Sequence, residues 1–376
     1  MSISKTFCPA KWDEILVNLS ANYVYSCCKA TPIKIVKKED INQALDQQKK
    51  NLLSSIEDPA CNYCWQVENV GHKSRRHTYL ENFDYSTINQ YSIDLVRPKM
   101  IEINLGNECN FQCIYCNPKF SSQWESDVKR QPYNIFADKF FYSVDEKNPN
   151  NIDDTIGWLK EIAEVDRLDI MGGEPLYNKN FIPVISSIKS KQLAFSTNLS
   201  FKDTSVIDTI LNLSSQYEEI FIRVSIDSTD KNAEFSRFGL DYQKFLSNLH
   251  YLINHAQSNV KISIGSLMTS ITIRDLNNTI TLVKELHELN PTSVLWDLAY
   301  CQDPKIFTLN TLPDKFKLDI LNQLNTVKEL SWVKGVDTLI GAVNGSKFNG
   351  TLYGLMKHFV KEFSERKGIV VPFELE

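Results

Sequence analysis

The segment from residue 100 to residue 116 reads MIEINLGNECNFQCIYC and decides the fold. Its first part, Met100–Leu105, is a short apolar run of the kind that forms a buried β-strand. Its second part carries three cysteines in the spacing Cys-x3-Cys-x2-Cys, at Cys109, Cys113 and Cys116. A strand that runs directly into a loop of potential ligands is typical of α/β proteins whose functional groups lie at strand ends.

The same strand pattern recurs along the chain after residue 99. Further apolar runs lie at Arg167–Met171, Gln192–Ser196, Ile220–Ile226, Lys261–Met268 and Ser293–Ala299. Amphipathic helical stretches lie between them, at Asp153–Val165, Ile182–Lys189, Asp203–Leu213, Tyr242–Ala256 and Arg274–Leu289. This alternation predicts right-handed βαβ crossovers and a parallel sheet. Six strands predict an open, partial (β/α)6 barrel, with its functional groups at the C-terminal strand ends.

The regions on either side of this predicted barrel have a different character. Residues 1–98 are rich in cysteine and lack clear β/α alternation, with one polar helical stretch at Asp40–Ser54. Residues 306–376 contain helical stretches at Asp314–Glu329 and Leu352–Arg366. We therefore predict three modules: a cysteine-rich N-terminal module (1–98), the barrel (99–305) and a helical C-terminal cap (306–376).

The composition excludes several classes of function. The 376 residues are 42% hydrophobic and 23% charged, and 41 basic against 46 acidic side chains give a net charge of −5. That balance provides no basic surface for nucleic acid or for an anionic membrane. No apolar run approaches the roughly 20 residues that span a bilayer, and no signal-peptide core is present. We expect a cytoplasmic protein, in which clustered cysteines are metal ligands or redox groups rather than disulfides.

The three-cysteine loop has a specific chemical interpretation. Three thiolates are one ligand short of a structural zinc site, which takes four protein ligands. They match three irons of a cubane cluster and would leave its fourth iron open for another ligand. Zinc or uncoordinated thiols are the alternatives.

A second set of cysteines precedes the barrel. Cys61 and Cys64 form a Cys-x2-Cys pair, and Cys8 and Cys27 add two more thiols, with Cys28 adjacent to the last. Four thiolates complete a coordination shell. On spacing alone they suit a structural zinc site and a fully ligated iron–sulfur cluster equally well.

A second motif follows the second predicted strand of the barrel. It reads Gly172-Gly173-Glu174-Pro175. Paired glycines let the backbone approach a ligand closely, and Glu174 can accept hydrogen bonds from an ammonium group. Alone, the motif would be an ordinary turn at a strand exit.

Together the two motifs resemble the radical S-adenosylmethionine (radical SAM) enzymes over about residues 99–305. The resemblance rests on Cys109, Cys113 and Cys116, on Tyr115 before the last cysteine, and on the Gly-Gly-Glu-Pro motif. It implies a [4Fe–4S] cluster on the three cysteines whose open iron binds S-adenosylmethionine. An electron, from a donor such as flavodoxin or ferredoxin, would then cleave the sulfonium to methionine and a 5′-deoxyadenosyl radical that abstracts a substrate hydrogen.

The resemblance also implies further cofactor contacts. Gly172, Gly173, Glu174 and Pro175 would lie at the methionine moiety. Polar residues at two later strand ends, Thr197 with Asn198 and Ser225 with Asp227, resemble positions that contact the cofactor, the second pair at its ribose. Ordinary strand-end hydrogen bonds are the alternative for these four residues.

The N-terminal cysteines resemble the auxiliary-cluster modules, SPASM and twitch, of the same enzymes. Cys64-Trp65-x2-Glu68 with Gly71, Ser74 and Arg75 is similar to twitch-containing members, as is Ser121-Ser122-Gln123-Trp124. Here the module precedes the barrel, whereas SPASM follows it, and Asn22 stands where the family has glycine. The spacing from Asn22 favours Cys27 over Cys28 as a ligand. The resemblance implies an auxiliary iron–sulfur cluster that accepts an electron from the substrate or shapes the substrate pocket.

The expected reaction is oxidation or rearrangement at an unactivated C–H bond of a peptide or small molecule. A second hypothesis is a redox-neutral epimerase, in which Cys301 at the end of the last strand returns a hydrogen atom to the substrate radical. A buried cysteine is more often a small hydrophobic residue. A hypothesis of another class is a non-catalytic zinc or iron–sulfur binding protein.

Overall fold

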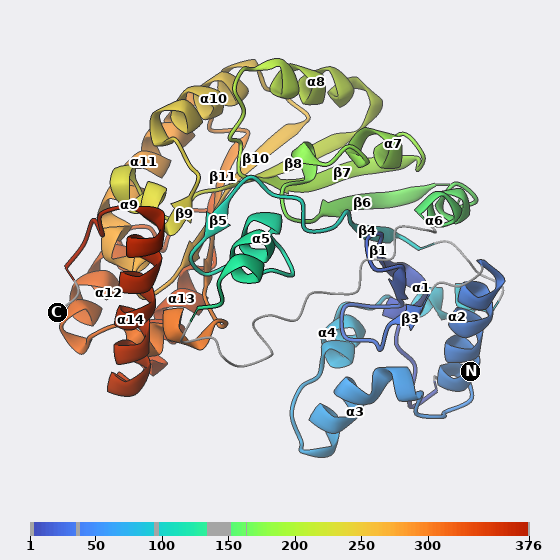
Figure 1. Ribbon diagram of the computed structural model, residues 1–376. Helices are drawn as coiled ribbons and strands as arrows, with labels where there is room; N and C mark the ends of the chain where they lie inside the picture. The colour runs from blue at the N-terminus through green and yellow to red at the C-terminus, as the bar shows by residue number, and fades with distance from the viewer. Residues whose placement is uncertain (1–3, 35–37, 94–97, 134–151, 163, 375–376) are drawn as a thin grey trace. The chain divides into compact units, whose positions relative to one another are not determined.

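The structure is a computed structural model that describes residues 4–34, 38–93, 98–133, 152–162 and 164–374 (Figure 1). The chain divides into two compact units. The first comprises residues 1–106, 145–172 and 178–194, and the second comprises residues 107–144, 173–177 and 195–376. Each unit is described by itself.

The first unit contains a mixed sheet in the order β6-β4-β1-β2-β3. The strands are β1 (Glu14–Asn18), β2 (Tyr23–Tyr25), β3 (Ile33–Lys34), β4 (Met100–Asn104) and β6 (Val165–Met171). β1 and β6 lie parallel to β4, one on each side of it. β2 pairs antiparallel with β1, and β3 pairs antiparallel with β2. The helices are α1 (Ala10–Asp13), α2 (Lys38–Leu53), α3 (Asn62–Asn69), α4 (Arg75–Glu81), α6 (Ile152–Leu159) and α7 (Phe181–Ile185).

The N-terminal module contributes a strand to this sheet, which the sequence did not lead us to expect. β1 pairs with β4 over its full length, from Glu14 opposite Met100 to Asn18 opposite Asn104. Ile15 and Val17 of β1 are buried, as are Ile101 and Ile103 of β4, so the two strands share one apolar layer.

A tight hairpin joins β1 to β2. Asn18 Oδ1 accepts hydrogen bonds from Ser20 Oγ at 3.0 Å and from Ala21 N at 3.1 Å. Asn22 then adopts a left-handed φ of 56°. Asparagine tolerates this conformation better than most residues other than glycine, because its short amide can bond locally. Asn22, which stands where the resembling family has glycine, therefore adopts a backbone conformation that glycine also allows.

The second unit contains a parallel sheet in the order β8-β10-β11-β12. The strands are β8 (Glu219–Ser225), β10 (Val260–Met268), β11 (Val294–Tyr300) and β12 (Val333–Lys334). Helices α8 (Ser205–Leu213), α10 (Tyr242–His255) and α11 (Leu276–Leu289) alternate with them and lie along the strands (Figure 1). A separate short sheet pairs β5 (Gln112–Cys113) with β9 (Arg237–Phe238), and β9 follows α9 (Asp230–Ser236).

These elements confirm the predicted α/β class and its partial-barrel type. All six predicted strands occur, including β7 (Ser190–Thr197), whose residues are divided between the two units. Neither set of paired strands closes on itself among the described residues. Two predicted helices end early: α6 at Leu159 and α7 at Ile185, because the chain turns there toward β6 and β7. The stretch predicted at Asp314–Glu329 forms a short 3-10 turn followed by α12 (Lys317–Asn325).

The C-terminal helices supply the largest aromatic core of the second unit. α13 (Val336–Gly345) is followed by α14 (Gly350–Lys367), whose Phe359 and Phe363 are fully buried. Their rings lie 6.1 and 5.8 Å from that of Trp124, on α5 (Ser122–Arg130). Ile114 of the cysteine loop packs into the same cluster. The cap is therefore part of the packing that supports this loop. None of the described helices is long and apolar enough to cross a membrane.

Candidate active site

The first turn of α5 holds the cysteine loop in place. The Ser122 hydroxyl accepts a hydrogen bond from Cys109 N at 3.1 Å. The Ser121 hydroxyl donates to Phe111 O at 2.7 Å, and the Trp124 indole donates to Cys113 O at 2.8 Å. The segment 121–124 was noted in the sequence only for its similarity to twitch-containing enzymes. In the structure it holds the backbone at Cys109 and Cys113.

The far side of the loop is held by backbone pairing. Cys113 lies opposite Arg237 in the β5–β9 pair, and Ile114 N donates to Ser236 O at 2.9 Å. Cys116 N then donates to Cys113 O at 2.9 Å, which turns the chain at the third cysteine. The loop is therefore fixed by hydrogen bonds along its whole length.

The three thiols share one poorly solvated environment. Burial raises the pKa of the Cys109 thiol to about 12, and it raises the pKa of Cys113 and of Cys116 as well. Cys113 adds to the rise in pKa at both Cys109 and Cys116, and Cys109 adds to the rise at Cys116, so the three thiols lie close together. A thiol that binds a metal loses its proton, because the positive charge of the metal stabilises the thiolate.

The arrangement suits a cluster better than a single ion. Among the described residues, no three side chains of Cys, His, Asp or Glu converge closely enough to share one metal ion. In a cubane each cysteine binds a different iron, so a cluster does not require convergence on one point. Three adjacent thiols on a fixed loop fit that donor set.

The Gly-Gly-Glu-Pro motif packs directly against the start of this loop. A Cβ atom on Gly173 would lie 2.5 Å from Glu108 O and 2.9 Å from Asn107 O, distances that real side chains do not adopt. Glu174 N donates to Glu108 O at 2.8 Å. The backbone of the second motif thus touches the two residues that precede Cys109. Gly172, in the first unit, has a φ of 149°, which also favours glycine.

The carboxylate of Glu174 is held by a dense set of donors. It accepts hydrogen bonds from the Thr197 hydroxyl at 2.9 Å, from Asn198 N at 2.5 Å and from Leu176 N at 3.2 Å. Burial raises the pKa of Glu174 to about 7, and these bonds oppose that rise. Asn198 also donates from Nδ2 to Asn110 Oδ1 at 2.7 Å. Thr197 and Asn198 therefore position Glu174 and connect it to the cysteine loop, a role that the sequence did not indicate.

A buried polar triad lies beside Cys113. The Tyr115 hydroxyl donates to Asp227 Oδ2, and Arg237 Nη1 lies 2.7 Å from the Tyr115 oxygen and 3.1 Å from Asp227 Oδ2. Asp227 Oδ1 accepts from Leu267 N at 2.8 Å. Arg237 opposes the effect of burial on the pKa of Cys113. Sequence reasoning missed Arg237, because no local pattern marks an arginine as buried.

Ser225 and Cys301 lie at the ends of two strands in this unit. Ser225 is the last residue of β8, two residues before Asp227. Cys301 directly follows β11, is buried and lies 3.3 Å from Asp303 O through its sulfur. It lines a cavity of about 370 Å³ together with Lys305 and Asn310. Burial raises the pKa of the Cys301 thiol to about 12, and Asp227 adds to that rise.

The first unit gathers the N-terminal cysteines. Cys8, Cys27 and Cys61 share one buried cluster, and Cys64 is buried in the first turns of α3. The hairpin brings Cys8 and Cys27 together, because Cys8 precedes β1, Cys27 follows β2, and the start of β1 lies at the same end of the antiparallel pair as the end of β2. Cys28 is exposed.

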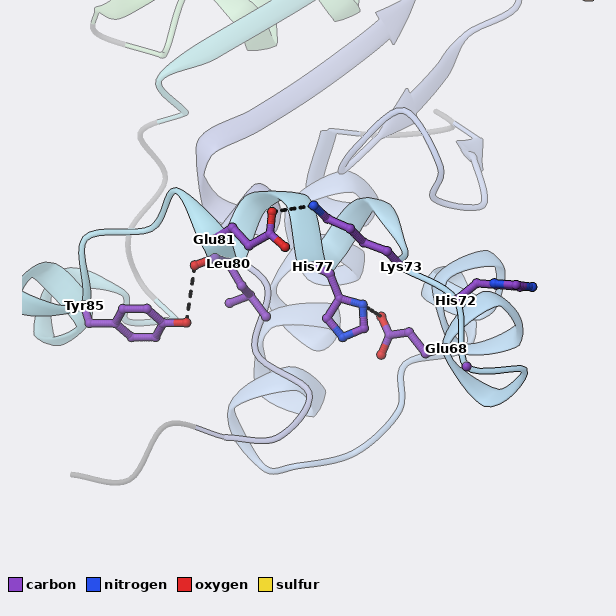
Figure 2. Close-up of a pocket in the computed structure, with 8 residues that line it drawn as sticks. Glu68, His72, Lys73, His77, Leu80, Glu81 and Tyr85 are labelled. Atoms are coloured by element: carbon purple, nitrogen blue, oxygen red, sulfur yellow. Dashed lines mark hydrogen bonds and ion pairs between the residues drawn. The ribbon is translucent and has the colours of Figure 1, made fainter. Parts of the chain in front are cut away.

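A network of charged and polar side chains, formed by Glu68, Ser74 and Arg76, lies near these cysteines. Glu68 accepts two hydrogen bonds from Arg76, at 2.5 and 3.0 Å, and one from the Ser74 hydroxyl. Arg76 is the arginine of this network, whereas Arg75 bonds Tyr79. Figure 2 shows the outer side of the network, where Glu68 and His77 line a surface pocket of about 650 Å³.

Comparison with protein families found one match to this chain. Residues 103–283 match the family model described as Radical SAM superfamily, and the matched region contains the cysteine loop and the Gly-Gly-Glu-Pro motif. The matched segment is a radical SAM domain. Members of this superfamily use a [4Fe–4S] cluster and S-adenosylmethionine and need an electron donor.

Several solved structures of radical SAM enzymes are similar at low identity. Histidine-tagged anSMEcpe with bound AdoMet is 19% identical, with 65% of this chain and 61% of that chain covered and a TM-score of 0.39. Streptococcus suis SuiB bound to precursor peptide SuiA is 12% identical, with 96% and 70% covered and a TM-score of 0.37. HydG from Carboxydothermus hydrogenoformans, an FeFe-hydrogenase maturase, is 13% identical, with 86% and 72% covered and a TM-score of 0.37. The chain thus spans 61% of the first of these proteins. No curated protein matches it.

The contact at Gly173 gives a testable prediction. Gly173→Ala should force the backbone of Asn107 and Glu108 away, with a loss of about 1–3 kcal/mol in the free energy of unfolding and less iron bound per chain after anaerobic reconstitution. The matched control is Gly354→Ala in α14, where a Cβ meets nothing within 4 Å. That change should stabilise the chain by up to about 1 kcal/mol, as a helix-interior alanine does. Equal thermal midpoints and equal iron contents for the two variants would contradict the assignment.

Proposed function

We propose that this radical SAM enzyme cleaves S-adenosylmethionine reductively at a [4Fe–4S] cluster held by Cys109, Cys113 and Cys116. The cluster, when bound and reduced, supplies the electron that yields methionine and a 5′-deoxyadenosyl radical, and this radical abstracts a hydrogen atom from a peptide or small-molecule substrate. The observation that carries the proposal is the fixed three-thiol loop, one ligand short of a cubane, packed against Gly173 and Glu174.

Glu174 is suited to bind the ammonium group of S-adenosylmethionine. Its carboxylate is almost fully buried and held by three donors from Thr197, Asn198 and Leu176. A positive charge brought beside it favours the ionised carboxylate and lowers its pKa. Gly172, Gly173 and Pro175 shape the turn that presents it, and we propose the whole motif as the contact for the methionine moiety.

The end of β8 is proposed to contact the ribose. Ser225 and Asp227 are the residues assigned to this role. Both oxygens of Asp227 already have protein partners, which are Tyr115, Arg237 and Leu267 N. Asp227 thus holds the Tyr115 side chain beside Cys113, and Ser225 leaves a hydroxyl at the strand end for the cofactor.

We further propose that Cys8, Cys27, Cys61 and Cys64 hold an auxiliary iron–sulfur cluster in a twitch-like module. The support is their common burial, the left-handed Asn22 in the hairpin before Cys27, and the exposure of the alternative, Cys28. This cluster would accept an electron from the substrate radical and so make the reaction an oxidation, or would shape the substrate pocket. The three-module organisation, 1–98, 99–305 and 306–376, belongs to the same proposal.

The chemistry also suggests partners and location. Reduction of the cluster requires a low-potential one-electron donor, for which flavodoxin or ferredoxin is proposed. Seven cysteines used as ligands require a compartment that keeps thiols reduced, so we propose the cytoplasm.

A second candidate reaction is supported by Cys301. Burial keeps this residue as a thiol at neutral pH, and it lines a cavity at a strand end. An S–H bond in that place can return a hydrogen atom to a substrate radical, which would make the reaction a redox-neutral epimerisation.

The first test removes one thiol of the loop. Cys113→Ala should abolish formation of 5′-deoxyadenosine from S-adenosylmethionine in anaerobically reconstituted, dithionite-reduced enzyme, measured by liquid chromatography, because the cluster loses one of three ligands. Cys28→Ala, which removes an exposed thiol, should leave the rate within about twofold. Cleavage by Cys113→Ala at the parent rate would show that the cluster lies elsewhere, and parent protein that binds only zinc would favour the non-catalytic alternative.

The second test separates the adjacent N-terminal cysteines. In a chain carrying Cys109→Ala, Cys113→Ala and Cys116→Ala, any remaining iron belongs to the auxiliary site. Cys27→Ala should then lose most of that iron, whereas Cys28→Ala should retain it, as measured by iron and sulfide analysis. Retention by both variants would exclude Cys27 as a ligand.

The third test distinguishes oxidation from epimerisation. With the substrate identified from neighbouring genes, turnover in D2O should place one deuterium in the product if Cys301 is the hydrogen donor, and Cys301→Ala should abolish that incorporation. A deuterium-free product from the parent enzyme, with two electrons lost from the substrate, would exclude the epimerase.

A further inference from the structure

A buried ammonium group lies among the N-terminal cysteines. Lys11 is 4% exposed, and its Nζ donates to Ser26 Oγ at 2.5 Å and to Gln48 Oε1 at 3.4 Å. Its backbone N donates to Cys8 O at 3.3 Å, and the positive charge of Lys11 opposes the rise that burial causes in the pKa of Cys61. Ser26 and Gln48 also bond each other at 2.6 Å, so the lysine is held firmly.

The charge of Lys11 lacks a carboxylate partner. Among the described residues, no Asp or Glu oxygen lies within the 4.0 Å that defines an ion pair with its Nζ. Lys11 lowers the pKa of Glu14, but burial has the larger effect and raises this pKa to about 7, so at neutral pH the carboxyl carries only part of a negative charge. A buried cation is costly unless an anion compensates it. The cysteines provide that anion when they act as thiolate ligands.

A second cation, Arg76, lies near Cys8 and Cys64. Arg76 Nη1 donates to Lys5 O and Phe7 O, both at 3.2 Å, so it binds the chain immediately before Cys8. Its guanidinium lies 5.2 Å from the ring centre of Trp65, which follows Cys64. Unlike Lys11, Arg76 is compensated, because Glu68 pairs with it through two hydrogen bonds.

We propose that Lys11, assisted by Arg76, raises the reduction potential of the auxiliary cluster on Cys8, Cys27, Cys61 and Cys64, and so makes that cluster an electron acceptor. The inference rests on the proposed function, because it assumes the auxiliary cluster. One-electron reduction adds a negative charge to the cluster, and a fixed cation a few ångströms away favours the reduced form. Zinc, which has no accessible redox change, would make the lysine irrelevant to electron transfer.

The difference in compensation gives the two cations distinguishable effects. Removing the charge of Lys11 removes an uncompensated cation and should lower the potential. Replacing Glu68 by glutamine leaves Arg76 without its anion and should raise the potential. A purely structural role for these side chains does not predict shifts of opposite sign.

The experiment uses the full chain with Cys109→Ala, Cys113→Ala and Cys116→Ala, so that only the auxiliary cluster is loaded. Its potential is measured by a dithionite titration monitored by electron paramagnetic resonance. Lys11→Met should lower the equilibrium constant for reduction at least tenfold, which is about 59 mV for a one-electron couple. Lys11→Arg, which keeps the charge, should change it less than threefold, and Glu68→Gln should increase it.

Each outcome decides the proposal. Equal potentials for Lys11→Met and its parent overturn it, as does zinc in place of iron at the auxiliary site. Loss of iron from Lys11→Met alone supports the need for the charge, whereas loss from Lys11→Arg as well shows that the lysine acts through its shape and overturns the proposal. Failure of the proposed function would give a different result. In that case the auxiliary cluster of the parent enzyme would still be reduced by dithionite, but S-adenosylmethionine would not be cleaved.

Discussion

The close contact between Gly173 and the backbone of Asn107 and Glu108 is the constraint on which the active site depends. It joins two motifs that lie more than sixty residues apart, and it leaves no room for a side chain. Because Glu174 follows directly and bonds Glu108 O, the carboxylate is placed relative to the cysteine loop through the backbone. A site built in this way resists small displacements, since neither motif can shift without the other.

The electrostatics of the site follow from the same tight packing. Desolvation disfavours charge on Cys109 and on Glu174, whose pKa values rise to about 12 and about 7. The protein offsets this cost locally, with Arg237 beside Cys113 and with backbone and hydroxyl donors at Glu174. In the proposed function, the iron cluster and the cofactor's ammonium group would supply the remaining positive charge. Binding and charge formation are therefore coupled, so the site is charged mainly when its ligands are present.

The sequence predicted the parts of the fold that depend on local pattern and missed those that depend on distant packing. Apolar runs predicted all six barrel strands, because buried apolar residues recur at every second position in strands such as β4, β6 and β8. β1 was missed, since it has only three consecutive apolar residues, 15–17, between Glu14 and Asn18. Arg237 and Lys11 were missed because an isolated basic residue gives no sign of burial. The roles of Thr197 and Asn198 toward Glu174 depend on a contact across more than twenty residues, and the assignment of modules and site residues stays a prediction.

The pairing of β1 with β4 has a consequence for how the chain can be shortened. β4 is the strand that leads into the cysteine loop, and β1 satisfies the hydrogen-bonding groups along one of its sides. A fragment that begins at the barrel would expose those groups as an open edge, which is a template for aggregation. The N-terminal module is thus also the edge protection of the first barrel strand, so its loss would harm solubility before any question of electron transfer arises.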